Sequence, residues 1–434
     1  MKIHLINIGC KVNFAETSRL KDLFEKRGHE ITEKAETAEV ILINTCTVTN
    51  RADSDCRKSI RKAKREAPNA YIGVFGCFAQ LNPDELEQLE EVNAVYGIKE
   101  KFMIPDLIEA AFNESANPFE HKSINVSDLS ELHFDAACSY DNESRSRAFL
   151  KIQDGCDYSC TYCTIPAARG ANRCLDFADL PAQFKIIQDG GYKEAVISGI
   201  NIGEYHSKED KKFIDVVKLI ADSDIDFRVR ISSIEPNLVT EEMINIIAGS
   251  ENLCNHLHIP LQSGSDTILN LMKRRYNTNM FREKIELIKS IIPDCCIGVD
   301  VITGFPGETD DLFEQTYSFL KTLPISYLHV FTYSERAGTP ATNFKGVVPH
   351  IKRKDRTIAL RKLSDRKLKE YNKTQIGKTV DFLPERFFNA KNYTVGHTEN
   401  YLNCKVTSET ELENKLYKVE IVSAEGEFVV GKIV

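Results

Sequence analysis

The sequence predicts an α/β protein in three parts: a small N-terminal parallel sheet with helices, a central partial (β/α) barrel and a small all-β barrel at the C-terminus. Two observations lead to this prediction. Apolar runs alternate with helical patterns through most of the chain, which is typical of parallel sheets covered by helices. From Thr374 onward the pattern changes to short alternating runs separated by turn residues, which favours a small barrel.

The N-terminal part, residues 1–113, has the pattern of a βαβαβα series. Its apolar runs and helical patterns are Ile3–Ile8, Phe14–Arg27, Val40–Ile43, Asp55–Glu66, Tyr71–Phe75 and Pro83–Glu91. Crossover helices make the strands of such a series parallel, so their carboxyl ends lie at one edge of the sheet. The next segment, residues 114–146, is polar and irregular and is predicted to be a linker.

The central part, residues 147–373, contains six further β-type runs with helical patterns between them. The runs are Phe149–Ile152, Glu194–Ile197, Phe227–Ile231, His256–Ile259, Gly298–Ile302 and Tyr327–Tyr333. Helical spacing is clear at Phe281–Ile292 and Leu312–Leu323. Repeated βα units predict a parallel barrel, with its active site at the carboxyl ends of the strands. The last part, residues 374–434, is the predicted all-β barrel.

Composition excludes several classes of protein. A hydrophobic content of 42% supports packed cores, and a net charge of −8 argues against coating nucleic acid by bulk positive charge. The first apolar run is short and interrupted by Asn7 and Gly9, and no run approaches the ~20 apolar residues of a membrane span. We expect a cytoplasmic protein. Its 13 cysteines then favour metal or redox chemistry over disulfides.

Three cysteines form a C-x3-C-x2-C cluster directly after the first predicted barrel strand. They are Cys156, Cys160 and Cys163. Three such thiolates can hold three irons of a 4Fe-4S cluster and leave the fourth iron open to another ligand. The alternative is a structural zinc site, which would need a fourth protein ligand, and Cys174 is the only weak candidate nearby.

Three other cysteines share a position in the predicted N-terminal sheet. Cys10, Cys46 and Cys77 each follow a β-type run. Because the strands are parallel, we expect the three thiols to converge at one sheet edge, where they could hold a second cluster with an open iron. The alternative is three unrelated buried thiols, since free cysteine is often buried.

The loop cluster, with Tyr162 before its last cysteine, resembles the motif of the radical S-adenosylmethionine enzymes, and the chain as a whole resembles the methylthiotransferases. The N-terminal segments that carry this resemblance are GCKVN at 9–13, NTCTV at 44–48 and GC at 76–77. The central segments are CTYCTIP at 160–166, GINIG at 199–203, RISSIEP at 230–236, HLHIPLQSGS at 256–265, GFPGE at 304–308 and YSERAGT at 333–339.

The resemblance implies a radical-SAM barrel, a TRAM-like C-terminal barrel, two 4Fe-4S clusters and two molecules of S-adenosylmethionine. One molecule would methylate sulfur at the N-terminal cluster, and the other would be cleaved at the barrel cluster to a deoxyadenosyl radical. The radical would remove the hydrogen at position 2 of an adenine, which then takes the methylthio group. The reductant would be an electron donor such as a flavodoxin or ferredoxin.

Six residues at predicted strand ends are candidate contacts of S-adenosylmethionine: Gly199, Ser232, Ser233, Glu235, Gly304 and Gly307. Small residues there would admit backbone contacts, and polar ones could bind the amino group and ribose. Glycines at strand ends are also simple turn formers. His256 and His258 share one strand face by the period of two, and a core role is favoured for His256.

The segments at Lys11–Asn13 and Asn400–Tyr401 resemble the branch that acts on threonylcarbamoyladenosine in tRNA, next to the anticodon. Relatives act on isopentenyladenosine in tRNA or on an aspartate of a ribosomal protein. A rival of another class is a non-catalytic, metal-stabilised RNA-binding protein. Three basic runs favour RNA: 57–65, 273–275 and 352–373. The C-terminal part has 7 Lys+Arg against 9 Asp+Glu, which argues against charge-driven RNA binding by that part.

Overall fold

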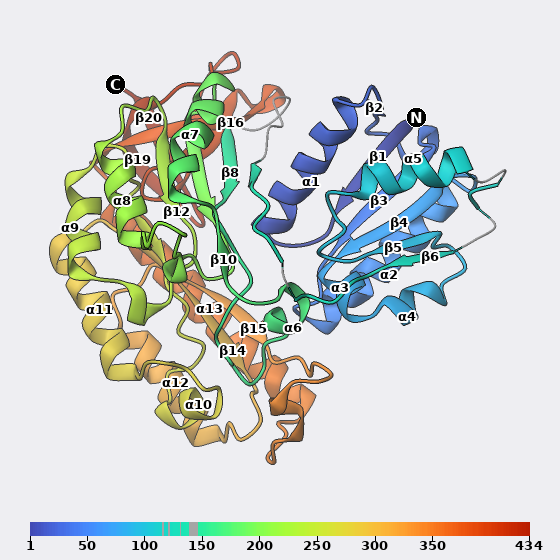
Figure 1. The fold of residues 1–434 in the computed structure, drawn as a ribbon. Helices are drawn as coiled ribbons and strands as arrows, with labels where there is room; N and C mark the ends of the chain where they lie inside the picture. Colours follow the sequence, from blue (N-terminus) through green and yellow to red (C-terminus); the bar gives the residue numbers. More distant parts are fainter. Residues whose placement is uncertain (115–116, 120–121, 131, 139–145) are drawn as a thin grey trace. The chain divides into compact units, whose positions relative to one another are not determined.

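The computed structural model describes residues 1–114, 117–119, 122–130, 132–138 and 146–434 (Figure 1). The chain divides into two compact units. Unit 1 comprises residues 1–140, 149–175 and 334–339, and unit 2 comprises residues 141–148, 176–333 and 340–434. Unit 1 therefore contains both the N-terminal sheet and the loop that carries the C-x3-C-x2-C cluster.

Unit 1 is built on a six-stranded, fully parallel sheet with the order β2-β1-β3-β4-β5-β6. Its strands are β1 (Lys2–Asn7), β2 (Glu30–Ile31), β3 (Val40–Thr45), β4 (Tyr71–Gly76), β5 (Ala94–Tyr96) and β6 (Ser123–Asn125). Its helices are α1 (Lys11–Glu25), α2 (Asn50–Glu66), α3 (Cys77–Leu81), α4 (Pro83–Glu87) and α5 (Ile104–Glu114). The small parallel N-terminal sheet predicted from the sequence is confirmed. Strand β6 lies inside the predicted linker, part of which falls outside the described residues.

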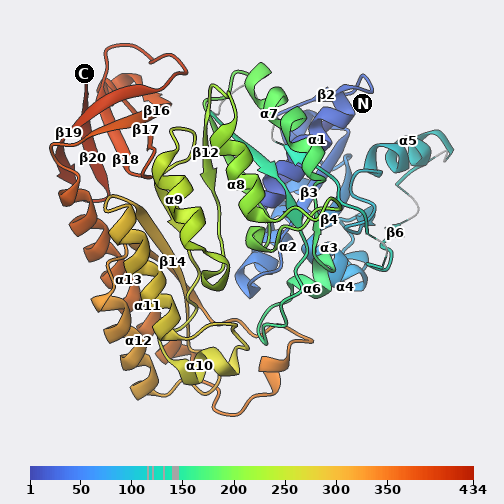
Figure 2. The ribbon, with the colours of Figure 1, turned by 60° about the vertical axis from the view of Figure 1, so that its left-hand side comes forward.

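Alternating side chains give the sheet two hydrophobic faces. Ile41 and Ile43 of β3 pack with residues of α2, whereas Val40 and Leu42 pack with residues of α1 and α5. The helices that follow β1 and β3 therefore cover opposite faces of the sheet, as Figures 1 and 2 show. The strand order reverses between β1 and β3, and the carboxyl ends at such a switch point form the usual binding crevice of an open α/β sheet.

The remaining elements of unit 1 frame the cysteine loop. Strand β7 (Ala137–Cys138) pairs antiparallel with β8 (Arg147–Lys151), and β9 (Gln153–Asp154) pairs antiparallel with β10 (Arg173–Cys174). The loop between β9 and β10 contains the three cysteines and the short helix α6 (Ile165–Arg169). Helix α6 packs against α3, which begins at Cys77.

Unit 2 contains the parallel strands and helices of the central part. Strand β11 pairs with β12, and β13, β14 and β15 form a second parallel set. These strands are β11 (Glu194–Ser198), β12 (Arg228–Ile231), β13 (His256–His258), β14 (Cys296–Thr303) and β15 (Tyr327–Thr332). The helices are α7 (Leu180–Asp189), α8 (Phe213–Asp222), α9 (Glu241–Gly249), α10 (Asp266–Leu271), α11 (Thr278–Ile291), α12 (Asp310–Thr322) and α13 (His350–Thr374). The described residues contain no helix with the length and apolarity of a membrane span.

The C-terminal residues form a closed five-stranded barrel in the order β16-β17-β18-β20-β19, which confirms the predicted all-β barrel. Its strands are β16 (Thr379–Phe388), β17 (Tyr393–Thr398), β18 (Asn403–Thr407), β19 (Tyr417–Glu425) and β20 (Phe428–Ile433). Arg228 and Arg230 of β12 are buried, share Glu194 of β11 and donate hydrogen bonds to four backbone carbonyls of this barrel. The ion cluster fixes the barrel to strands β11 and β12.

Candidate functional site

The loop triad comprises Cys156, Cys160 and Cys163, between β9 and α6. None of the three is in a disulfide, Cys160 is buried, and the other two are partly exposed. The backbone N–H groups of Tyr158 and Ile165 each donate to a cysteine sulfur of this loop, Cys156 and Cys163 respectively, at 3.4 Å. Backbone donors of this kind stabilise the negative charge of a thiolate.

The strand-end triad comprises Cys10, Cys46 and Cys77. Cys46 directly follows β3, Cys77 directly follows β4, and Cys10 immediately precedes α1 after β1. Burial, with a smaller contribution from Cys10, raises the pKa of Cys46 to about 11. Burial likewise raises the pKa of Cys77 to about 12, with added effects from Cys46 and Cys10. The three thiols therefore lie close enough to interact electrostatically.

Arg169 connects the two triads within unit 1. It is the last residue of α6, and its side chain is fully buried. Its Nε donates to Cys77 Sγ at 3.1 Å, and its Nη1 donates to Asp154 Oδ1 at 3.0 Å. Asp154 directly precedes the cysteine loop and its Oδ1 also accepts from the Gly155 N–H at 2.9 Å. One guanidinium thus contacts a sulfur of the strand-end triad and Asp154, which lies two residues before the first cysteine of the loop triad.

A buried ion network surrounds Arg169. Glu16 of α1 accepts from Arg169 at 3.0 and 3.1 Å, from Lys101 at 2.6 Å and from Lys151 at 3.1 Å. Burial opposes the ionised form of Glu16, but Arg169 and the two lysines outweigh it and hold the pKa of Glu16 well below its usual range. Burial lowers the pKa of Lys101 to about 8. The network ties α1 to β8 and β9 and so fixes the geometry between the triads.

A second arginine braces the loop after Cys46. Arg336, in the segment 334–339 that belongs to unit 1, donates to Asp53 at 2.8 Å and also to Thr47. Thr47 is the residue after Cys46, so Arg336 holds this loop in place.

Helix α2 begins directly after the same loop. Thr49 caps it by accepting from the Ala52 N–H. This cap explains why α2 begins at Asn50, earlier than the predicted start at Asp55.

Both triads have the chemistry expected of iron–sulfur ligands. The strand-end thiols have raised pKa values, so a bound metal must replace their protons to yield the thiolate. Arg169 would then donate to a charged sulfur, and hydrogen bonds to cluster sulfurs are known to tune such centres. Each triad supplies three thiols, and three thiolate ligands would leave one iron of a cubane cluster open.

The polar candidate contacts of S-adenosylmethionine lie after β12 in unit 2. Ser232 is buried, and its Oγ has no hydrogen-bond partner within the described part of the chain, which suits a hydroxyl that meets a polar ligand. Ser233 forms a parallel bridge with His258. Glu235 is engaged by Arg274 in an ion pair, and burial raises the pKa of this carboxyl.

The three candidate glycines occupy different settings. Gly199 directly follows β11 and is partly exposed. Gly304 has a φ of +77° and lies against the Arg353 side chain, which a Cβ would meet at 2.3 Å, so this glycine accommodates an arginine. Gly307 has a φ of +90° and accepts no β-carbon without backbone strain. These positions are explained in part by turn geometry.

The predicted basic runs are only partly free for RNA. On α2, Arg57 pairs with Glu85 at 2.7 Å. In the run 352–373, Arg353 and Arg356 are buried, and Lys367 donates to two backbone carbonyls at the end of α12 and in the following turn. His256 is buried and bonds Tyr327 at 3.1 Å, in line with the core role favoured for it.

Sequence reasoning did not identify Glu16, Lys101, Lys151 or the role of Arg169. Their side chains meet across sequence separations of up to 153 residues, so no local spacing signals the contact. The closest indication of this contact in the sequence is that Asp154 and Arg169 lie on either side of the three loop cysteines. Sequence reasoning also missed Asp300 and His329, which form a cluster with His258 on β13–β15.

Two family models match the chain. An uncharacterized protein family, UPF0004, matches residues 2–97, and the radical SAM superfamily matches residues 150–320. The first range contains the strand-end triad and the second contains the loop triad.

Full-length relatives agree with this pairing. A threonylcarbamoyladenosine tRNA methylthiotransferase of Bacillus subtilis is 38% identical, over 97% of this chain and 95% of the relative. The protein of the same name from Aquifex aeolicus is 34% identical over 97% and 100%. A tRNA-2-methylthio-N(6)-dimethylallyladenosine synthase of Porphyromonas gingivalis is 31% identical over 89% and 84%.

Solved structures share the fold. The radical S-adenosylmethionine methyltransferase TsrM of Kitasatospora setae, solved with cobalamin and a [4Fe-4S] cluster, matches with a TM-score of 0.56 at 15% identity, over 78% of this chain and 76% of TsrM. At this identity the match supports the fold alone. Membership of the superfamily implies a 4Fe-4S cluster and S-adenosylmethionine as cofactors. On its full-length relatives and its two family domains, the chain belongs to the radical S-adenosylmethionine methylthiotransferase family and is an enzyme of that kind.

Proposed function

We propose that the protein places a methylthio group on carbon 2 of N6-threonylcarbamoyladenosine, next to the anticodon of tRNA, using two molecules of S-adenosylmethionine and two 4Fe-4S clusters. The observation that carries the proposal is the presence of two separate three-thiol sites in one compact unit, joined by the buried Arg169. The choice of substrate is supported by relatives that are named for threonylcarbamoyladenosine and align over nearly the whole chain.

The two sites have separate tasks in this proposal. Cys156, Cys160 and Cys163 would hold the cluster that supplies, with S-adenosylmethionine, a deoxyadenosyl radical. Cys10, Cys46 and Cys77 would hold the cluster that carries the sulfur to be transferred. Reactions of this type depend on the distance between reacting groups, which the chain must set. Arg169 and Glu16 do this by fixing α6 against α3 and α1.

Residues after the barrel strands would bind S-adenosylmethionine. Ser232 offers a buried hydroxyl without a protein partner in the described residues, and Ser233 and Glu235 follow it on the same loop. Arg274 holds the Glu235 carboxyl in place, so that a ligand amino group would meet an oriented acceptor. Gly199, which directly follows β11, and the positive-φ turn residues Gly304 and Gly307 complete the proposed set.

RNA binding would rely on local basic surfaces. Lys58 and Lys62 of α2 and Arg275 of unit 2 keep exposed side chains, although each pairs with a carboxylate. Surface pairs of this kind exchange readily for phosphate contacts. The acidic balance of the C-terminal barrel argues that this domain contributes by shape or by specific residues rather than by net charge.

The test is mass spectrometry of nucleosides. tRNA that carries threonylcarbamoyladenosine is incubated anaerobically with reconstituted enzyme, S-adenosylmethionine and a flavodoxin or ferredoxin system as reductant. A methylthio mass increment on that nucleoside supports the proposal. Parallel reactions offer RNA with isopentenyladenosine and ribosomal protein; modification of either of these alone would overturn the substrate assignment. Absence of both deoxyadenosine and product would favour a non-catalytic RNA-binding protein.

A further inference from the structure

Strands β13, β14 and β15 present a polar patch that the proposed chemistry has not used. The strands are adjacent and parallel, and their register places Asp300 directly opposite His329 and His258 opposite Gly298. Along β15, Leu328 and Val330 are buried while His329 and Phe331 are exposed. Side chains alternate along a strand, so Tyr327, His329 and Phe331 share the open face.

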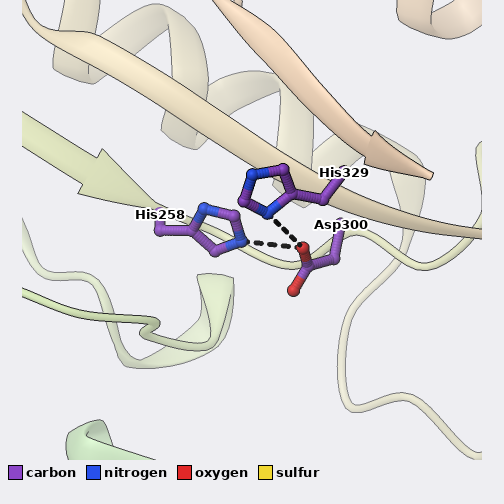
Figure 3. Close-up of side chains that lie close together, drawn as sticks. All are labelled: His258, Asp300 and His329. Carbon is purple, nitrogen blue, oxygen red and sulfur yellow. Dashed lines mark ion pairs between the residues drawn. The ribbon is translucent and has the colours of Figure 1, made fainter. Parts of the chain in front are cut away.

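Two imidazoles converge on one carboxylate oxygen at this face (Figure 3). His258 Nε2 lies 2.8 Å from Asp300 Oδ1, and His329 Nδ1 lies 3.5 Å from the same oxygen. We call these three residues the His–Asp–His triad. The side chain of His258 is 12% exposed, that of Asp300 22% and that of His329 56%, so the triad opens on the His329 side.

Aromatic side chains pack next to the triad. The Tyr327 ring lies over Gly298, where a Cβ would meet the ring at 2.3 Å. Tyr327 forms a hydrogen bond with His256 at 3.1 Å, and the His256 ring packs against that of Tyr401 of the C-terminal barrel, tilted by 34° at a centroid separation of 4.3 Å. His329 and Tyr327 rings lie 5.1 Å apart. Ordered neighbours of this kind pre-organise the triad for a ligand.

The open face also carries an exposed aromatic ring. Phe331 is 45% exposed, follows His329 by two residues and so lies about 7 Å further along the strand on the same side. Enzymes that act on a base stack it on aromatic rings and hydrogen-bond its edges. Ser233, one of the candidate S-adenosylmethionine contacts, forms a bridge with His258, so the face adjoins the proposed cofactor site.

We propose that this face binds the modified nucleoside itself, with Phe331 stacking on the adenine and the His–Asp–His triad hydrogen-bonding the threonylcarbamoyl group. The inference rests on the proposed function and names the residues that would select its substrate. The hydroxyl of the threonyl group donates to Asp300, and its carboxylate accepts from imidazole N–H groups of His329 and His258. Ring N–H groups of the two imidazoles supply the kind of donor that a ligand carboxylate accepts from.

The test compares binding of two RNAs by the reconstituted enzyme. The RNAs are anticodon stem-loops of the same sequence, one with threonylcarbamoyladenosine and one with unmodified adenosine, and affinity is measured by fluorescence anisotropy. Phosphate contacts contribute equally to both, so the ratio of affinities reports the modified group alone. We expect His329→Ala and Asp300→Asn to reduce the wild-type preference by about tenfold or more.

Phe331→Ala should act differently and lower the affinity for both RNAs by the same factor, because the base stacks in both RNAs. Phe331→Trp should keep the affinity for both. The matched control is His206→Ala. His206 is likewise 56% exposed and paired with an aspartate, Asp210, at 2.7 Å, but lies on a surface loop. It should leave the preference unchanged and should still form deoxyadenosine.

Two results would overturn the inference. One is a wild-type preference retained in both His329→Ala and Asp300→Asn. The other is one equivalent of zinc or manganese in the wild-type enzyme that is lost in His329→Ala, since the triad would then be a metal site. Failure of the proposed function would appear separately, as a wild-type enzyme that prefers the modified RNA without methylthiolating it.

Discussion

The two cysteine triads of unit 1 are assembled in opposite ways. The loop triad comes from one short segment, whose spacing alone brings Cys156, Cys160 and Cys163 together. The strand-end triad comes from three separate βα turns, and only the parallel order of β1, β3 and β4 places Cys10, Cys46 and Cys77 at one edge. A local site depends on its own turn geometry, whereas an assembled site depends on the whole sheet.

The environments of the triads differ accordingly. The loop sulfurs meet backbone N–H donors within the loop, while Cys77 meets the guanidinium of Arg169 from another element. Burial raises the pKa of Cys46 and Cys77 well above the usual thiol range. Substitutions that separate the two triads functionally are therefore the direct way to test this contrast.

The largest effect is expected in the loop triad. Replacing Cys160 with alanine removes one of the three proposed iron ligands and should abolish deoxyadenosine formation and all methylthiolation, because both would depend on this cluster. The product to measure is deoxyadenosine, by liquid chromatography of anaerobic reactions. Cys174→Ser is the control: its thiol points to Asn172 Oδ1 at 3.6 Å and should be dispensable. Loss of iron in Cys174→Ser would instead favour a four-ligand metal site.

The second largest effect should separate deoxyadenosine formation from methylthiolation. Cys77→Ala removes a proposed cluster ligand of the strand-end triad and should stop methylthiolation while deoxyadenosine is still formed, because the loop triad remains complete. Cys404→Ala removes a buried cysteine from the C-terminal barrel and should keep both activities. A Cys77→Ala enzyme that methylthiolates tRNA with normal yield would contradict the assignment of the N-terminal cysteines.

These contrasts also explain what the sequence could predict. The strands of the N-terminal and central parts could be predicted because their apolar runs are separated by clear helical patterns. The position of Cys10, Cys46 and Cys77 at one sheet edge could be predicted because βαβ crossovers make the strands parallel. The Arg169–Glu16 contact could not be predicted, because charged residues normally lie at the surface and nothing local marks them as buried partners. Likewise, the His–Asp–His triad depends on the register that pairs Asp300 with His329.

A third prediction concerns stability of the network between the triads. Arg169→Met leaves the buried Glu16 and Asp154 without one of their cations and should destabilise unit 1 by about 3–5 kcal/mol, the usual cost of breaking a buried ion pair. Chemical denaturation followed by circular dichroism measures the shift. Arg27→Met is the matched control, since Arg27 also pairs with two carboxylates but at the surface, and should cost at most about 1 kcal/mol. Equal losses in the two variants would argue against a special role for the buried network.

The smallest effect distinguishes the thiols of the strand-end triad from one another. In metal-free protein, Cys10 is exposed, whereas the pKa values of Cys46 and Cys77 are raised to about 11 and about 12. A raised pKa keeps the thiol protonated, so the reactive thiolates of Cys46 and Cys77 are scarce at pH 8 and rise about tenfold per pH unit. Alkylation by iodoacetamide, followed by peptide mass spectrometry, should label Cys10 first and Cys77 last. Arg169→Met should slow Cys77 further, because Arg169 lowers its pKa; faster labelling in that variant would mean that the expected destabilisation of unit 1 opens access to the thiol by more than the lost charge raises its pKa.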